Sequence, residues 1–299
     1  MSKLKLIIKN EVMTDLTSKS FWVMTLVVPV LYVVFGLIVG MMAAESDTFA
    51  KFANPTAPDE ENLSGWQIAG MMGGLLLTLF LMIYGSQIYA KVRKEKINRI
   101  MEVLATSVTG RTLMIGKVIS VLIVGFVQLA VWVLFGLAAM GIFIAVAAAA
   151  MPMDWLAEPH LWLSIMWLTL FFFGGYLFYG SIYAACGAIT DKDNENQGYM
   201  TAITMLLLIS MYVGQFAVDN GTSAITQICC FVPFTAPSVC TVAAFAGDMP
   251  VWETALQCIL LYGWAFLALS FSGKIYTSSI LLKGRKFSPK DIVLFLKAK

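Results

Sequence analysis

Charged side chains are scarce in this chain. Of its 299 residues, 13% are charged and 59% are apolar. Soluble globular domains have about 25% charged and about 45–50% apolar residues. This composition excludes an ordinary soluble domain. It predicts an all-α polytopic membrane protein, with the whole chain, 1–299, forming a single transmembrane domain.

Residues that build metal and catalytic centres are also scarce. The only histidine is His160, and none of the five cysteines forms a C-x-x-C spacing, so a zinc site is not indicated. No nucleophile, base and acid can be recognised together, and we expect neither enzymatic activity nor a cofactor. Cys229 or Cys230 could pair with Cys240, but we expect buried thiols rather than a disulfide.

A nucleotide site is missing as well. Residues 110–118, GRTLMIGKV, resemble a phosphate loop, but five residues separate the glycines and Val118 stands where serine or threonine is required. ATP would therefore have to be bound by another chain. No Asp, Glu, Arg or His lies in the interior of the predicted spans, since His160 and Glu253 are at the outer ends of theirs. Ion-coupled carriers and proton pumps usually carry such groups, so their absence disfavours both classes.

Long apolar segments are what the chain does have. A helix needs about 20 apolar residues to cross a bilayer. Six candidate spans meet this requirement: 20–43, 66–90, 113–147, 160–189, 198–218 and 252–275. They place 19 of the 20 lysines and arginines on one side, while Lys51 and ten carboxylates lie on the other. The positive-inside rule then predicts that both termini are cytoplasmic.

Two apolar segments depart from a simple six-span pattern. The run from about residue 118 to 150 is too long for one perpendicular crossing, and a hairpin of two crossings would invert everything after it; we expect one long helix. Pro233 and Pro237 interrupt the segment 222–250. We therefore expect a re-entrant external helical hairpin there, before the last span, with halves at 224–232 and 238–246.

Three cytosolic segments are amphipathic: 1–19, 91–117 and the tail 283–299. The segment 91–117 is strongly basic and cannot enter hydrocarbon, so it must fold against the membrane or a partner. Within it, Glu95, Arg99 and Glu102 share one helical face. From the residues alone, binding to lipid head groups and docking of a cytosolic protein are equally supported. The loop 190–198 is acidic, which favours either solvent or a basic protein surface.

Several segments carry a family likeness. The N-terminal segment has Lys9, Glu11, Lys19, Phe21 and Pro29; the middle segment has Glu95, Lys96, Arg99, Met101, Glu102, Leu104, Ser107, Val108, Leu113, Gly116 and Lys117. The closing segment is YTSSILLKGRKFSPKDI, preceded by Gln197 and the proline-rich turn 233–237. In these motifs the chain resembles the type-2 ABC exporter permeases, especially the sodium-export-permease-like branch. That branch often has a large external domain after its first span, whereas residues 44–65 form only a short loop.

The resemblance implies a complete architecture and a function. It implies six transmembrane helices with an N-terminal amphipathic elbow helix, in the bacterial inner membrane. It also implies that two permease chains, identical or paralogous, work with two cytosolic ABC ATPase chains, in contact with lipid and without nucleic acid. The segment 91–117 would hold the coupling helix, which favours protein docking. The expected coupling residues are Lys94, Glu95, Arg99 and Glu102, with Asp191, Asp193 and Glu195 as a second contact.

Two other functions compete with an ATP-driven exporter. The chain could be a channel or secondary carrier that works without ATP, or a membrane anchor for an ATPase that moves no solute. The uncharged spans disfavour the carrier. The sequence does not identify the substrate, which could be sodium, a drug, a peptide or a lipid.

Overall fold

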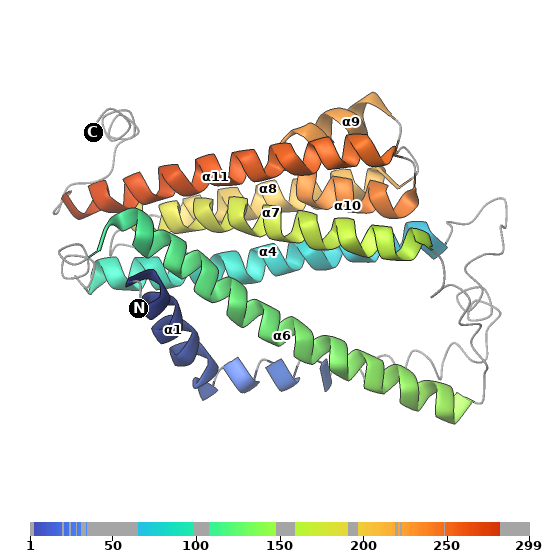
Figure 1. Cartoon of the computed structure of the whole chain (residues 1–299), viewed down its shortest axis with the longest axis horizontal. Coiled ribbons are helices and arrows are strands. Elements are labelled where there is room, and N and C mark those ends of the chain that lie inside the picture. Colours follow the sequence, from blue (N-terminus) through green and yellow to red (C-terminus); the bar gives the residue numbers. More distant parts are fainter. Residues whose placement is uncertain are drawn as a thin grey trace.

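The computed structural model describes residues 3–19, 21–23, 25–27, 29–30, 34, 65–98, 108–147, 159–190, 197–218, 221, 223–247 and 249–281. These residues form helices and contain no strands (Figure 1). In chain order the helices are α1 (Lys3–Leu16), α4 (Gly65–Ile97), α6 (Gly110–Ala147), α7 (Pro159–Ile189), α8 (Gln197–Phe216), α9 (Ala224–Phe231), α10 (Ala236–Ala246) and α11 (Val251–Leu281).

Within the described residues, five helices are long and apolar enough to cross a membrane. They cover Ala69–Ile97, Thr112–Trp132, Pro159–Ile189, Gly198–Phe216 and Val251–Ser279. They correspond to the last five predicted spans. The first, 20–43, falls largely outside the described residues, as do the loop 44–65 and the tail 283–299. The long apolar run after residue 118 belongs to one continuous helix of 38 residues, α6, as expected.

The helices are arranged as a bundle and a divergent pair. Helices α4, α7, α8 and α11 run roughly alongside one another, whereas α6 crosses them at one end and then leads away (Figure 1). Helix α1 lies against the first part of α6. A Cβ placed on Gly116 of α6 would be 2.8 Å from Cγ2 of Ile7, so Ile7 fills the notch that this glycine leaves.

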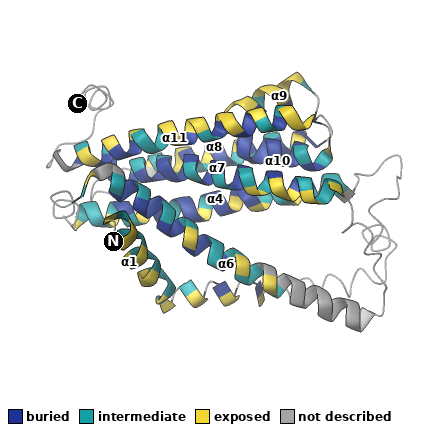
Figure 2. Cartoon of the chain, viewed as in Figure 1, coloured by how far each residue is buried: buried dark blue, intermediate teal, exposed yellow. Residues whose placement is uncertain are grey.

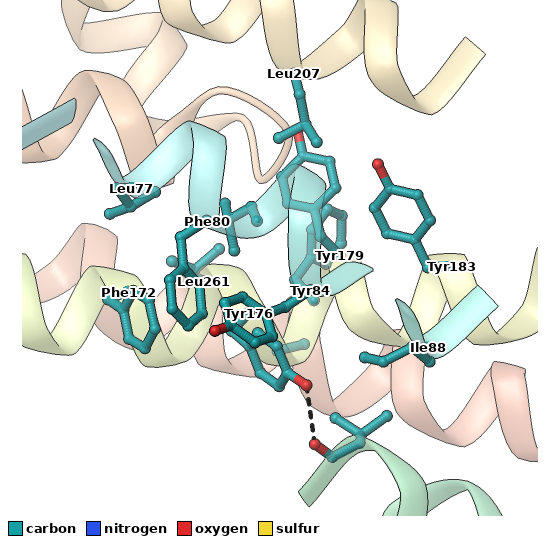
Figure 3. Close-up of a cluster of buried hydrophobic side chains, with 14 of the residues drawn as sticks. Leu77, Phe80, Tyr84, Ile88, Phe172, Tyr176, Tyr179, Tyr183, Leu207 and Leu261 are labelled. Carbon is teal, nitrogen blue, oxygen red and sulfur yellow. Dashed lines mark hydrogen bonds between the residues drawn. The ribbon is translucent and has the colours of Figure 1, made fainter. Parts of the chain in front are cut away.

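The centre of the core is the crossing of α4 and α7. Large buried side chains from both helices, with contributions from α8 and α11, fill it (Figure 3). The crossing is close because each helix offers a glycine to a tyrosine of the other. A Cβ on Gly85 would lie 2.2 Å from Cδ2 of Tyr183, and a Cβ on Gly187 would lie 2.7 Å from the carbonyl oxygen of Tyr89. The two helices therefore pack as one rigid pair.

The segment 222–250 contains two short helices, α9 and α10, separated by residues 232–235. Ser223 caps α9, since its hydroxyl accepts from the Thr226 amide, and Gly247 ends α10 in the left-handed region at φ 79°. Most of α10 is buried between α4, α7 and α8 (Figure 2). Gly70 and Gly74 of α4, spaced as G-x-x-x-G, permit this approach, because a Cβ on either would lie within 2.8 Å of an α10 side chain.

Side-chain hydroxyls satisfy the backbone of the α9–α10 turn. Tyr179 of α7 donates to the carbonyl of Phe234, and Ser210 of α8 donates to the carbonyl of Thr235 at 3.3 Å. The Thr235 hydroxyl in turn donates to the carbonyl of Cys229. Turn carbonyls outside the helical ladder thus have partners from the protein itself, although Phe231, Val232 and Phe234 remain exposed around them.

Candidate functional site

A cluster of ion pairs joins α1, α4 and α6 at the end of the bundle where α1 lies. Its centre is Lys117 of α6, whose side chain is only 2% exposed. The Lys117 ammonium is 3.1 Å from Oε1 of Glu11 on α1 and forms a close ion pair with Glu95 of α4. A buried ammonium without such partners would be strongly destabilising, because the protein interior replaces the lost hydration poorly. The two carboxylates therefore account for the burial of Lys117.

A second lysine extends the cluster toward solvent. Lys91 of α4 forms a close ion pair with Asp15 of α1 and is 3.6 Å from Oε2 of Glu11. These three side chains are 22–24% exposed, so solvent screens this half more than the Lys117 half. Glu11 contacts both lysines and links the two halves. We call Glu11, Asp15, Lys91, Glu95 and Lys117 together the ion-pair cluster.

Helix α11 adds a neutral partner. The hydroxyl of Tyr276, a fully buried residue, donates to Oε2 of Glu95 at 3.4 Å. Glu95 thereby accepts from α6 on one oxygen and from α11 on the other. The cluster joins α1, α4 and α6, and Tyr276 connects α11 to it. No set of three or more His, Cys, Asp or Glu side chains in the described residues could hold a metal ion.

The local sequence explains how each helix presents its charges. Glu11 and Asp15 are four residues apart on α1, and Lys91 and Glu95 are four residues apart on α4, so each pair shares a helical face. Leu4 and Ile7 lie on the same inward face of α1 as Glu11. Contact of these apolar residues with α6 places Glu11 against Lys117, which follows Gly116 directly.

The opposite face of α4 borders a cavity of about 360 Å³. Its lining includes Arg93, Lys94 and Ile97, together with Tyr89, Ala90 and Asn98. Next to it, the Tyr89 hydroxyl donates to Oγ1 of Thr190, the residue that follows α7, at 3.2 Å. The end of α7 is therefore joined to α4 about two turns before α4 ends, next to the start of the predicted cytosolic segment 91–117.

The predicted coupling residues have different positions. Lys94 is exposed beside the cavity, whereas Glu95 points away from it into the ion-pair cluster and is 15% exposed. These neighbours on α4 thus lie on different faces. Arg99, Glu102, Asp191, Asp193 and Glu195 lie outside the described residues.

Sequence reasoning missed most of the ion-pair cluster. It counted Lys91 only as a basic residue of a cytosolic segment, and it gave Glu11 and Lys117 no structural role beyond their places in the family motifs. The i, i+4 spacings on α1 and α4 were the available signal for two pairs. No local signal identifies Lys117, because its partners are 22 and 106 residues away.

Comparison with known proteins gives one family match and uncharacterized relatives. Residues 48–274 match the family described as ABC-2 family transporter protein. The uncharacterized protein MJ1024 of Methanocaldococcus jannaschii is 25% identical over 206 residues, which cover 69% of this chain and 48% of that protein. The uncharacterized protein YhaP of Bacillus subtilis is 24% identical over 240 residues, covering 79% of this chain and 57% of that protein.

The chain thus spans about half the length of the curated relatives it matches. No solved structure matches it significantly. The relatives have no functional names, so the sodium-export branch gains no support from them. The family match covers most of the chain and agrees with the five apolar helices. This multi-pass membrane protein belongs to the ABC-2 transporter family, the membrane permease components of ABC transporters.

Proposed function

We propose that the chain is the permease subunit of an ATP-driven exporter. A separate cytosolic ATPase chain would hydrolyse ATP, and its closure would drive substrate outward through a pair of permease chains, identical or paralogous. Membership of the ABC-2 family carries this proposal. Residues 110–118 resemble a phosphate loop but lack its spacing and its serine or threonine. This supports the proposal, since a partner chain would have to bind the ATP that drives transport. The charge distribution favours cytoplasmic termini. The bacterial inner membrane is the location that the family resemblance implies.

The contact of α4 with the end of α7 supports a single docking surface for the ATPase. Because Tyr89 bonds Thr190 and packs on Gly187, the predicted cytosolic segments 91–117 and 190–198 would start close to one another. Lys94, Arg99 and Glu102 would contribute from the first loop. Asp191, Asp193 and Glu195 would contribute from the second. Opposite charges on the two loops suit a partner surface with both signs of charge.

Glu95 would act differently from Lys94. Its carboxylate is occupied by Lys117 and Tyr276, so it would hold α4 in place behind the docking surface rather than contact the ATPase. A Glu95→Lys substitution would bury a second ammonium group next to that of Lys117. Its effect on ATP hydrolysis would therefore combine a loss of stability with a loss of docking.

The same proposal assigns membrane positions to α1 and to the α9–α10 hairpin. Helix α1 would lie along the inner surface as the elbow helix, with its exposed lysines toward head groups. The hairpin would re-enter the outer leaflet. Irregular backbone is tolerated at that depth only where protein satisfies it. The hydroxyls of Tyr179, Ser210 and Thr235 meet this requirement.

The experiment measures ATP hydrolysis by the ABC ATPase that co-purifies with the tagged permease in nanodiscs. Lys94→Glu and Glu102→Lys should each lower the permease-dependent part of the hydrolysis several-fold, while insertion and yield stay normal. Lys274→Glu is the matched control. Lys274 is an exposed lysine near the end of α11, a helix that does not contribute to the proposed docking surface.

Three outcomes would contradict the proposal. Unchanged ATP hydrolysis in both the Lys94→Glu and Glu102→Lys variants would show that the ATPase does not dock at this surface. Solute flux through the purified chain alone would instead favour a channel or carrier. Stable recruitment of an ATPase without any transport would favour an anchor.

A further inference from the structure

We propose that Lys117 is a positioning residue that fixes the α1–α6 pair to the rest of the bundle. Through the ion-pair cluster, the pair would then follow the cytosolic end of α4 when the ATPase moves it. The mechanical purpose rests on the proposed function. The structural claim, that this lysine sets the position of one group of helices against another, can be tested on the permease alone.

The first step is that α1 and α6 form a unit. Ile7 of α1 fills the notch at Gly116 of α6. Further along, Nε1 of Trp132 on α6 donates to the carbonyl of Thr25 at 3.1 Å. The chain after α1 therefore follows α6 for at least four turns, from Gly116 to Trp132.

The second step is that this unit touches the bundle along a limited part of α6. Tyr176 of α7 donates to the carbonyl of Val118 at 3.1 Å, and Tyr84 of α4 donates to Gln128. Between these levels a Cβ on Gly125 would lie 2.8 Å from the ring of Phe80. Beyond them Leu134 is 66% exposed, and α6 diverges from α7 (Figure 1). A contact near one end of a long helix lets small changes there move the far end.

The third step is that the ion-pair cluster lies across this boundary. Lys117 pairs with Glu95 of the bundle, while Lys91 of the bundle pairs with Glu11 and Asp15 of α1. A buried charge must keep its partners, because an unpaired charge in the protein interior is strongly destabilising. Lys117 is the deepest of these charges and binds one carboxylate on each side. Its geometry therefore selects one placement of α1–α6 on the bundle.

The test measures a distance across the boundary. Leu134→Cys on α6 and Trp162→Cys on α7, at positions 66% and 59% exposed, carry spin labels in a full-length chain whose five native cysteines are replaced by alanine. Double electron–electron resonance in nanodiscs then gives the distribution of distances between the two labels. The chain with Lys117 intact should give one narrow peak.

Two variants remove the positive charge of Lys117. Lys117→Met alone leaves two carboxylates without their buried cation. Lys117→Met combined with Glu95→Gln removes a charge from both sides, so it leaves less uncompensated charge if the single variant misfolds. Both should broaden the distribution and add a second peak. Lys274→Met, an exposed lysine near Tyr276 on α11, is the control and should leave the peak unchanged.

An unchanged narrow peak in the double variant, Lys117→Met with Glu95→Gln, would overturn the inference. A double variant that no longer inserts or elutes as one species would also overturn it, because Lys117 would then be needed for folding rather than for position. A broadened peak with unaltered ATP hydrolysis in the co-purified complex would support the positioning role and count against coupling through α4. Failure of this inference and failure of the proposed function are therefore distinguishable.

Discussion

Gly85 shows how closely single residues determine the contact of α4 with α7. The ring of Tyr183 lies where a side chain at Gly85 would begin, 2.2 Å from an added Cβ, and Tyr183 is fully buried. Gly85→Ala should therefore destabilise the protein by about 1–3 kcal/mol through overpacking. The measurement is the unfolding temperature of the purified chain in detergent.

Gly263→Ala is the matched control for this substitution. Gly263 lies in the middle of α11, and an added Cβ there has no neighbour within 4 Å. Its unfolding temperature should stay the same or rise slightly, because alanine favours a helix. Equal losses of stability in both variants would show that the α4–α7 contact is not the cause.

At the residue scale the sequence reveals chemistry better than position. Glu95 and Lys94 are adjacent and both were expected at the coupling surface, yet they lie on different faces of α4. Helical geometry predicts that neighbours diverge by roughly a quarter of a turn or more. The direction in which each one faces depends on Lys117 and α1, and those contacts are long-range.

The two short helices α9 and α10 have a proposed place in the membrane that can be tested. Ile228 of α9 is 64% exposed, and Phe231 and Val232 beside it are exposed and apolar. If these helices lie in the outer leaflet, a spin label at Ile228→Cys should relax faster with molecular oxygen, which concentrates in lipid, than with a water-soluble nickel chelate. A label at Thr109→Cys, exposed just before α6, should show the reverse. Stronger relaxation by nickel at position 228 would place α9 in water.

The sequence predicted this element in part. Pro233 and Pro237 mark the break, and the expected halves 224–232 and 238–246 overlap α9 and α10. The deep burial of α10 could not be predicted, because it depends on Gly70 and Gly74, more than 150 residues earlier in the chain. Glycine spacing alone indicates close approach without naming the partner.

For the whole molecule, hydropathy locates apolar helices but not their arrangement. Lipid tails and protein cores both select apolar side chains, so α6 gives the same signal where it packs on Phe80 as where Leu134 is exposed. The divergence of α6 from the bundle was therefore not predictable from composition. Orientation is different, since it depends on charge outside the apolar segments.

The predicted orientation can be tested in intact cells. Thr109→Cys lies just before α6 at the end of the molecule that holds the ion-pair cluster, and Trp252→Cys lies in the first turn of α11, 69% exposed, at the opposite end. Both are made in the chain without native cysteines. A membrane-impermeant maleimide should label position 252 in intact cells and position 109 only after permeabilisation. The physical reason is that the six predicted spans put 19 of the 20 basic residues on the side of position 109, and such segments are retained in the cytoplasm. Labelling of position 109 in intact cells would reverse the orientation, and the ion-pair cluster could then not lie behind a cytosolic docking surface.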